Sequence, residues 1–407
     1  MVGGPQNLYN LLSQFSADSY CILTSYEAIR RGNASGTWLA GEYFFSDHAG
    51  PIEKLPVSQP SALRRTPFNW AYQWLGRLAR KMPYPAAYFL RATLTALYLL
   101  LTIVRMVRIG IRIVRQRGIR RILGISDVGP ALIATYLISR CTGVPYALYL
   151  FDIYLGNNLL PMNELLAKMF EPRMLKMASV VIVTNERTER FYRKRYGDTF
   201  KCAVVHNSVF PRGYESRRTP YNPSEPYTIL FTGQVYWAQE RSVMNLVRTM
   251  DELRDLRVQL DLYVPNASET LKLAIGARSN IRLTAATQSE MPAIQCSATL
   301  LFLPLSWHTK SLDVIATASP GKLADYLASG RPILIHAPPY TYVNQYAKEN
   351  GFALVVDEEN IEKLKDGIKK LLFDLEYSRQ LIENAKRTFY KNHDATINAQ
   401  KLAKILE

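Results

Sequence analysis

Ser319, Lys322 and Asp325 lie close together in the chain and supply groups that would bind a phosphate and a hydroxyl. Ser319 is a favourable N-cap residue and Pro320 suits the first position of a helix, so we predict that a helix begins here. A helix N-terminus offers free N–H groups and a partial positive charge to an anion. Lys322 would add a full charge to that site, and Asp325, one turn further on, would accept hydrogen bonds from a sugar hydroxyl.

The residues around this segment predict the elements that hold it. Leu323, Tyr326 and Leu327 recur at i, i+3 and i+4, which indicates one buried helix face. Gly330 would end the helix, and the apolar run at 333–335 predicts a buried strand. The alternative is an ordinary capped helix in an α/β domain that binds no ligand.

The run from Thr317 to Leu334 resembles the donor-binding segment of GT-B glycosyltransferases, in particular family 4 members that build bacterial surface polysaccharides. The resemblance implies that Ser319, Gly321 and Lys322 line the diphosphate of a nucleotide sugar and that Asp325 holds the ribose. Many members carry two glutamates separated by seven residues. Here Thr317 takes the first position and Asp325 the second, as in a branch with a Pro-Gly/Asn-Lys-Leu signature.

A second part of the donor site is expected after the apolar strand that ends near Phe231. In the family, the loop after this strand and the next helix supply two basic residues to the diphosphate. Gly233 and Gln234 occupy that loop, and Arg241 is the candidate for the second basic position. Lys322 and Arg241 would then stabilise the departing nucleotide. The alternative for Arg241 is a solvated side chain at the start of a helix.

Other candidates lie in the first half of the chain, on the side of the sugar acceptor. Asp152 ends an apolar strand, and by resemblance it would position or deprotonate the acceptor hydroxyl; the alternative is a cap or turn role. Asp127 is a weaker candidate of the same kind. The pair Gly3 and Gly4 matches a glycine loop of the family, and Asn207 is expected to fix a loop near the acceptor side.

No cofactor is expected from the sequence. The five histidines show no metal-ligand spacing, and there is no Asp-x-Asp pair of the kind found in metal-dependent sugar transferases. Neither a dinucleotide-binding glycine motif nor a P-loop is present. We therefore expect a metal-independent reaction with a nucleotide sugar as the substrate.

The net charge of +16 is concentrated in one segment, residues 54–126, which contains no Asp or Glu. Arg105, Arg108, Arg112 and Arg115 share a helical stripe next to an apolar stripe. This pattern predicts a helix in the interface of an anionic membrane. The apolar run at 85–104 is too short for a convincing span. The alternatives are a core helix whose arginines face water and a nucleic-acid-binding surface, which the long apolar runs disfavour.

Alternating strands and helices predict an α/β protein of GT-B fold, with two doubly wound Rossmann-like domains facing a cleft. We place the acceptor-binding domain at 1–210, a linker at 211–227 and the donor-binding domain at 228–377. A C-terminal helix at 378–407 would pack back on the first domain. The family has a strand before the glycine loop that is missing here, so we hypothesise that the native start lies upstream. Four scattered cysteines fit a reducing compartment.

These observations predict a retaining, hexosyl-type glycosyltransferase on the cytoplasmic face of the plasma membrane. It would move a sugar from a nucleotide-sugar donor to a hydroxyl of a lipid-linked or polysaccharide acceptor in cell-surface glycan synthesis. Two alternatives stay open: a non-catalytic GT-B scaffold in a polysaccharide assembly complex, and a sugar-nucleotide epimerase.

Overall fold

The computed structural model describes residues 4–25, 39–46, 86–126, 130–157, 161–307, 309 and 311–407. Gly3, Asp127 and residues 54–85 of the basic segment therefore lie outside the described residues. The chain divides into two compact units. The N-terminal unit contains Leu12–Val204 and Leu402–Glu407, and the C-terminal unit contains Val205–Lys401 and the residues up to Leu11. The predicted linker at 211–227 thus falls inside the C-terminal unit.

The C-terminal unit is built on a six-stranded parallel sheet in the order β12-β11-β10-β7-β8-β9. The order reverses between β7 and β10, and doubly wound sheets bind ligands beyond the carboxyl ends of the strands at such a point. The strands are β7 (Tyr227–Thr232), β8 (Val258–Tyr263), β9 (Ile281–Thr284), β10 (Leu300–Pro304), β11 (Ile333–His336) and β12 (Ala353–Val356).

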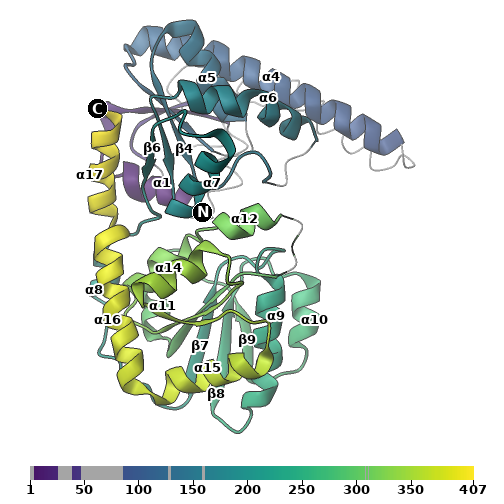
Figure 1. Cartoon of the computed structure of the whole chain (residues 1–407), viewed down its shortest axis with the longest axis vertical. Coiled ribbons are helices and arrows are strands. Elements are labelled where there is room, and N and C mark those ends of the chain that lie inside the picture. Colours follow the sequence, from purple (N-terminus) through teal and green to yellow (C-terminus); the bar gives the residue numbers. More distant parts are fainter. Residues whose placement is uncertain are drawn as a thin grey trace. The chain divides into compact units, whose positions relative to one another are not determined.

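Helices cover both faces of this sheet (Figure 1). Alternate residues of β10 point to opposite faces, so Leu301 and Leu303 join one apolar core while Leu300 and Phe302 join the other. The first core includes α11 (Met291–Ser297), α13 (Lys322–Ala328), α14 (Tyr342–Asn350) and α16 (Leu375–Asn392). The second includes α9 (Glu240–Thr249), η3 (Met250–Leu253), α10 (Glu269–Ile275) and α15 (Ile361–Phe373). The unit also contains the short helices α8 (Arg212–Glu215) and α12 (Leu312–Thr317).

The first helix of the chain, α1 (Gly4–Leu12), groups with the C-terminal unit rather than with the N-terminal domain in which we expected it. Asn7 Oδ1 accepts the backbone N–H of Ser208 at 2.8 Å, and Asn10 Nδ2 donates to the Ser208 carbonyl at 2.7 Å. These buried hydrogen bonds fix α1 to a segment about 200 residues away, which local sequence patterns do not reveal.

The prediction of a single C-terminal helix at 378–407 is wrong. The structure has two helices, α16 and α17 (Ala395–Leu406), with a break at His393 and Asp394. The break has a clear cause: Val209 inserts between the helices, donating its N–H to the His393 carbonyl and accepting the N–H of Ala395, both at 3.1 Å. These bonds replace the helical ones at this point.

The N-terminal unit has two parallel sheets among the described residues, one in the order β3-β4-β5-β6 and one formed by β1 and β2. Asn185 caps the helix Glu186–Tyr196 by accepting the N–H of Thr188. The strands are β1 (Cys21–Thr24), β2 (Glu42–Phe45), β3 (Ile122–Ile125), β4 (Tyr146–Leu150), β5 (Val180–Val183) and β6 (Cys202–Val204). The helices are η1 (Ala17–Ser19), α4 (Ala86–Arg117), α5 (Pro130–Thr142), α6 (Pro161–Met177) and α7 (Glu186–Tyr196).

The basic apolar region forms one continuous helix, α4, of 32 residues. By itself, the apolar run at 85–104 is too short for a convincing span. As part of α4, however, the segment Ala92–Arg117 is long and apolar enough to cross a membrane by length and composition. Core helices of soluble proteins pass the same test, and part of α4 packs against α5, α6 and β1. Length and composition alone therefore do not distinguish a membrane helix from a core helix, and the contacts and exposure of α4 are needed to do so.

Arg331 connects the predicted linker to the core of the C-terminal unit. Its side chain is buried, and Nε donates to the Cys296 carbonyl at 2.6 Å, while Nη1 and Nη2 donate to the carbonyl and the hydroxyl of Thr219 at 3.1 and 2.7 Å. The linker segment is therefore held by side-chain hydrogen bonds from a residue more than 100 positions away.

We predict that Arg331→Ala lowers the free energy of unfolding by about 3 kcal/mol, because it removes the hydrogen bonds to Thr219 and leaves the carbonyl of the buried Cys296 without its charged donor. Differential scanning calorimetry of the whole chain would measure the loss. Arg254→Ala is the matched control, because Arg254 is exposed and pairs with Asp251 on the surface, where such a pair contributes about 0–1 kcal/mol. Equal losses in the two variants would contradict the prediction.

Candidate functional site

Four of the predicted residues, Gly233, Ser319, Lys322 and Asp325, lie in the C-terminal unit and form what we call the α13 site. Gly233 follows β7, one of the two strands at which the sheet order reverses. Lys322 begins α13 and reaches β7, where its Nζ lies 3.9 Å from the centre of the Phe231 ring. The tertiary structure thus brings the two predicted parts of the donor site together.

Lys322 is the central group of the α13 site. Its ammonium is inaccessible to solvent and has no hydrogen-bond partner within the described part of the chain. The Phe231 ring offers it a favourable electrostatic contact, but an aromatic face accepts no conventional hydrogen bond from the ammonium. A buried ammonium without a hydrogen-bonding partner is costly, so this arrangement favours an anionic ligand at Nζ.

Gly233 keeps the space beside this ammonium open. Its φ of +111° lies in a region that side-chain-bearing residues rarely adopt. A Cβ atom at this position would come within 3.3 Å of Lys322 Nζ and 3.4 Å of Cε. Both the backbone conformation and the close approach therefore favour glycine here.

The start of α13 differs from the prediction. We expected Ser319 as the N-cap, but α13 begins at Lys322, with Gly321 at the N-cap and no side-chain cap. The helix has only seven residues, so its dipole alone is weak support for an anion site. The hydroxyl of Ser319 instead remains buried and, among the described residues, without a partner. The predicted apolar face is confirmed, since Leu323, Tyr326 and Leu327 are buried.

Asp325 is held by residues that the sequence analysis missed. The hydroxyl of Tyr214 donates to Asp325 Oδ1 at 2.5 Å and lies 3.0 Å from Gln295 Oε1. The Gln295 amide donates to the Thr232 hydroxyl at 3.2 Å, and Thr232 in turn contacts the Tyr326 hydroxyl at 3.3 Å. This chain of buried groups links Asp325 to the end of β7 and fixes the two parts of the site relative to each other.

No pattern in the sequence identified Tyr214 as a site residue. It lies on α8, inside the segment that we predicted as a linker from its Pro, Ser and charged residues. Its contact with Asp325 joins residues 111 positions apart. Only a residue alignment or a structure could have identified it.

Burial shifts the pKa values of Lys322 and Asp325 in the direction that favours their uncharged forms. It lowers the pKa of Lys322 to about 7, although the nearby negative charge of Asp325 acts in the opposite direction. It raises the pKa of Asp325 to about 6, against the hydrogen bond from Tyr214 and the charge of Lys322. Perturbed pKa values of this kind are typical of functional sites.

The other two predicted donor residues, Gln234 and Arg241, already have protein partners on the surface of the same unit. The Gln234 amide donates to the Asn266 carbonyl at 2.6 Å. Arg241, at the start of α9, forms an ion pair with Glu359, and its side chain is mostly exposed. Arg241 would have to exchange this carboxylate for a ligand, so Lys322 is the better placed of the two cations.

Asn207, predicted on the acceptor side, belongs to the C-terminal unit and fixes the loop before α13. Its amide donates to the Ser319 carbonyl at 2.7 Å, and its own carbonyl lies 2.7 Å from His393 Nδ1. The loop-fixing role that we expected for Asn207 therefore acts on the donor segment.

Asp152 lies in the N-terminal unit, in the loop after β4; the residue is exposed, although desolvation by the surrounding protein raises the pKa of its carboxyl. The loop around it is firmly anchored: the buried carboxylate of Glu171 accepts the N–H of Leu155 at 3.1 Å, and the Tyr192 hydroxyl accepts the N–H of Tyr154 at 2.9 Å. An exposed carboxylate on an anchored loop is suited to contact a ligand. Gly4 begins α1, whereas Gly3 and Asp127 are outside the described residues.

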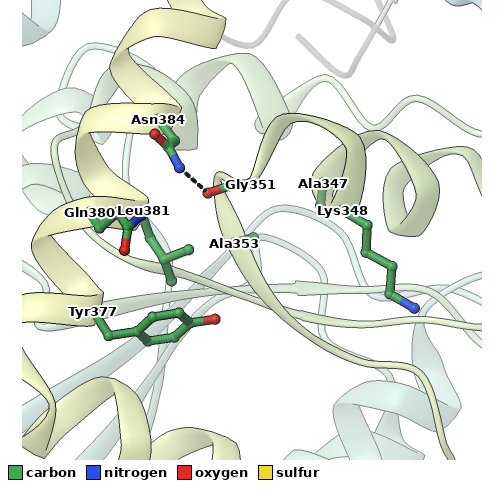
Figure 2. Close-up of a pocket in the computed structure, with 8 residues that line it drawn as sticks. All are labelled: Ala347, Lys348, Gly351, Ala353, Tyr377, Gln380, Leu381 and Asn384. Atoms are coloured by element: carbon green, nitrogen blue, oxygen red, sulfur yellow. Dashed lines mark hydrogen bonds between the residues drawn. The ribbon is translucent and has the colours of Figure 1, made fainter.

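One pocket of about 300 Å³ opens between α14, β12 and α16, where Asn384 Nδ2 donates to the Gly351 carbonyl at 2.8 Å (Figure 2). None of the predicted site residues lines it. Its one charged lining residue, Lys348, forms an ion pair with Asp357. Over the ranges that the structure describes, no cluster of three His, Cys, Asp or Glu side chains is arranged to hold a metal ion.

Comparison with known proteins identifies relatives by structure only. No family model matches the chain, and no curated protein matches it in sequence. The Anabaena protein HepE, solved with UDP and glucose, is similar with a TM-score of 0.65 and 12% identity over 99% of this chain and 96% of that one. A trehalose 6-phosphate synthase from Burkholderia multivorans has a TM-score of 0.58 and 12% identity over 95% and 97%. A glycosyltransferase from Rickettsia africae has a TM-score of 0.59 and 15% identity over 75% and 80%.

These likenesses confirm the predicted fold class: the chain has the GT-B fold with two Rossmann-like α/β domains. At such low sequence identity they carry no residue roles to this chain.

We predict that Lys322→Met stabilises the protein at pH 6 by about 2 kcal/mol and has little effect near pH 10. The unfolded lysine holds its proton up to about pH 10.5, whereas the folded one loses it near pH 7. The cost of burying the charge is therefore full below pH 7 and disappears toward pH 10. Urea unfolding at both pH values would measure it.

Lys348→Met is the matched control, because Lys348 is half-exposed and paired with Asp357 on the surface. Its effect on the free energy of unfolding should stay within about 0.5 kcal/mol. A Lys322→Met effect that is equal at the two pH values would show that the ammonium is not buried in the charged state.

Proposed function

We propose that this protein is a metal-independent, retaining glycosyltransferase that uses a nucleotide-sugar donor. The acceptor we propose is a hydroxyl of a lipid-linked or polysaccharide glycan in cell-surface glycan synthesis. The observation that carries the proposal is the buried ammonium of Lys322, which has no hydrogen-bond partner among the described residues. The likeness to the Anabaena protein solved with UDP and glucose supports a nucleotide diphosphate as the missing anion.

In this mechanism Lys322 stabilises the diphosphate as the bond to the sugar breaks. Negative charge grows on the departing oxygen, and a cation already fixed beside it stabilises the transition state more than the ground state. Lys322 is held on α13 and against Phe231, so it needs little reorganisation. Arg241 would add charge after releasing Glu359.

Asp325 would hold the ribose of the donor. Its Oδ1 accepts from Tyr214, and the carboxylate keeps further acceptor capacity for a ribose hydroxyl. The bonded Tyr214 fixes the direction in which the carboxylate points. Asp152 would position the acceptor hydroxyl or remove its proton, and its exposure on an anchored loop supports that assignment.

We also propose that the protein works on the cytoplasmic face of the plasma membrane, bound to anionic lipid. The support is the uneven charge of the chain, with fourteen Lys and Arg and no acidic residue from Lys54 to Ser126. Of this segment, the structure describes α4 and β3. A lipid-linked acceptor would be presented at that surface.

We predict that one of UDP, GDP, ADP and TDP stabilises the protein and that Lys322→Met removes the effect. A nucleotide at about 100 times its dissociation constant adds about 2.7 kcal/mol of stability, which a thermal-shift screen would detect. Lys348→Met should keep the shift. If none of the nucleotides shifts the unfolding temperature, the scaffold alternative becomes the better explanation.

We predict that Asp152→Asn lowers the rate of sugar transfer by about 10²–10⁴-fold, because the amide cannot accept a proton. The measurement is incorporation of labelled sugar from the nucleotide sugar into cell membranes. Nucleotide stabilisation should be unchanged, since Asp152 belongs to the other unit. Asp198→Asn is the control, because that carboxylate is exposed and pairs with Arg193. Full transfer activity of Asp152→Asn would exclude Asp152 as the base.

A further inference from the structure

Helix α4 has one face packed into the N-terminal unit. Leu99, Ile103, Met106 and Ile113 are buried, and Gly110 approaches the Ile138 side chain of α5 so closely that a Cβ would collide with it. These residues recur at intervals of three and four, which is the spacing of one helix face. The C-terminal half of α4 is therefore part of the core of the unit.

The opposite face of α4 changes character along its length. Leu97, Leu100 and Val104 are 46%, 45% and 43% exposed. The same stripe continues at intervals of three or four with Arg108, Arg112 and Arg115, which are also exposed. In the described part of the chain these three arginines have no acidic partner, whereas Arg117 pairs with Glu42 at 2.8 Å. The outward stripe is thus apolar in its first half and cationic in its second.

The N-terminal part of α4 extends beyond α5 and α6 (Figure 1). From Leu90 to Tyr98, no residue whose side chain the structure describes is buried. The exposed apolar surface is therefore the end of a projecting helix, with the arginines one to three turns further along.

We infer that the N-terminal half of α4 inserts obliquely into one leaflet of an anionic membrane. Leu97, Leu100 and Val104 would contact the acyl chains, and Arg108, Arg112 and Arg115 would bind the lipid phosphates. This inference refines the proposed membrane location and rests on it, but it does not depend on sugar transfer.

The order of side chains matches the order of layers in a bilayer. Hydrocarbon is followed by anionic headgroups and then water, as the apolar stripe is followed by arginines. Ala92 to Val104, which carries no charge, covers about 18 Å of helix axis at 1.5 Å per residue. Half of the hydrocarbon core is about 15 Å thick. A tilt of about 60° from the membrane normal would seat this length about 9 Å deep in one leaflet, with Arg108 near the boundary and Arg91 short of the bilayer midplane, where a charge is costly.

Two other arrangements of α4 fit the observations less well. A full span over Ala92–Arg117 would pull Ile103, Met106 and Ile113 out of the protein core. A nucleic acid would bind the arginines but leave Leu97, Leu100 and Val104 without an apolar partner. A lipid interface satisfies both halves of the stripe.

The first test is flotation of the full-length protein with vesicles of phosphatidylcholine alone or with 30% phosphatidylglycerol. We expect binding to the anionic vesicles at least tenfold stronger than to the neutral ones. Leu97→Glu with Leu100→Glu, and separately Arg108→Glu with Arg112→Glu, should each weaken binding at least tenfold. Leu273→Glu on α10 and Arg379→Glu on α16 are matched controls, since both positions are exposed, and neither should change binding.

The second test measures depth with an environment-sensitive fluorophore on a single cysteine, in a variant without the four native cysteines. We expect a blue shift with anionic vesicles at position 97 and none at position 115. Equal shifts at both positions would show a helix lying flat and would overturn the oblique insertion.

Further outcomes would also overturn the inference. Failure of the wild type to float would do so, as would flotation that the leucine variant leaves unchanged. Concentration-dependent dimerisation without vesicles, lost in the leucine variant, would identify a second copy as the partner of the stripe. Nucleotide stabilisation, measured in the same variants, reports on the α13 site alone and separates failure of this inference from failure of the proposed function.

Discussion

The ammonium of Lys322 is buried beside the Phe231 ring, and among the described residues nothing donates or accepts a hydrogen bond with it. Several residues of the C-terminal unit hold the ammonium in this unfavourable position. Leu323, Tyr326 and Leu327 anchor α13 in the core, and Gly233 leaves room for the ammonium where any side chain would crowd it. Burial lowers the pKa of Lys322 to about 7, so an anion that binds there also restores the charge. The site thus gives up stability, which is typical of sites that bind a ligand.

The surrounding polar groups are held by contacts from distant parts of the chain. Tyr214 of α8 binds Asp325, and Gln295 of α11 continues the network to Thr232 at the end of β7. Asn207 holds the carbonyl of Ser319 and is itself bound through its carbonyl to His393, at the break between α16 and α17. The break and the loop before α13 therefore share one hydrogen-bonded segment.

Many of the elements follow from local patterns in the sequence. The strand Val180–Val183 and the helices Pro161–Met177 and Glu186–Tyr196 are examples, because apolar runs, a proline start and the Asn185 cap mark them locally. β9 has little local signal, because Ile281–Thr284 is short and half polar. The break at His393 was missed because Val209 causes it from 184 residues away. The start of α13 was misplaced because Ser319 resembles a cap, although Asn207 holds the carbonyl of that residue outside the helix.

The sequence by itself determined the alternation of strands and helices, the placement of Lys322 and Asp325 one turn apart, and the concentration of charge in one segment. These properties depend on which side chains follow one another along the chain, and that order is local information. Only the tertiary structure decided that Lys322 has no hydrogen-bond partner among the described residues, that Tyr214 holds Asp325 and that α4 turns an apolar and then cationic stripe outward. Burial, pKa and exposure depend on atoms that folding brings together from distant positions, so no local pattern contains them.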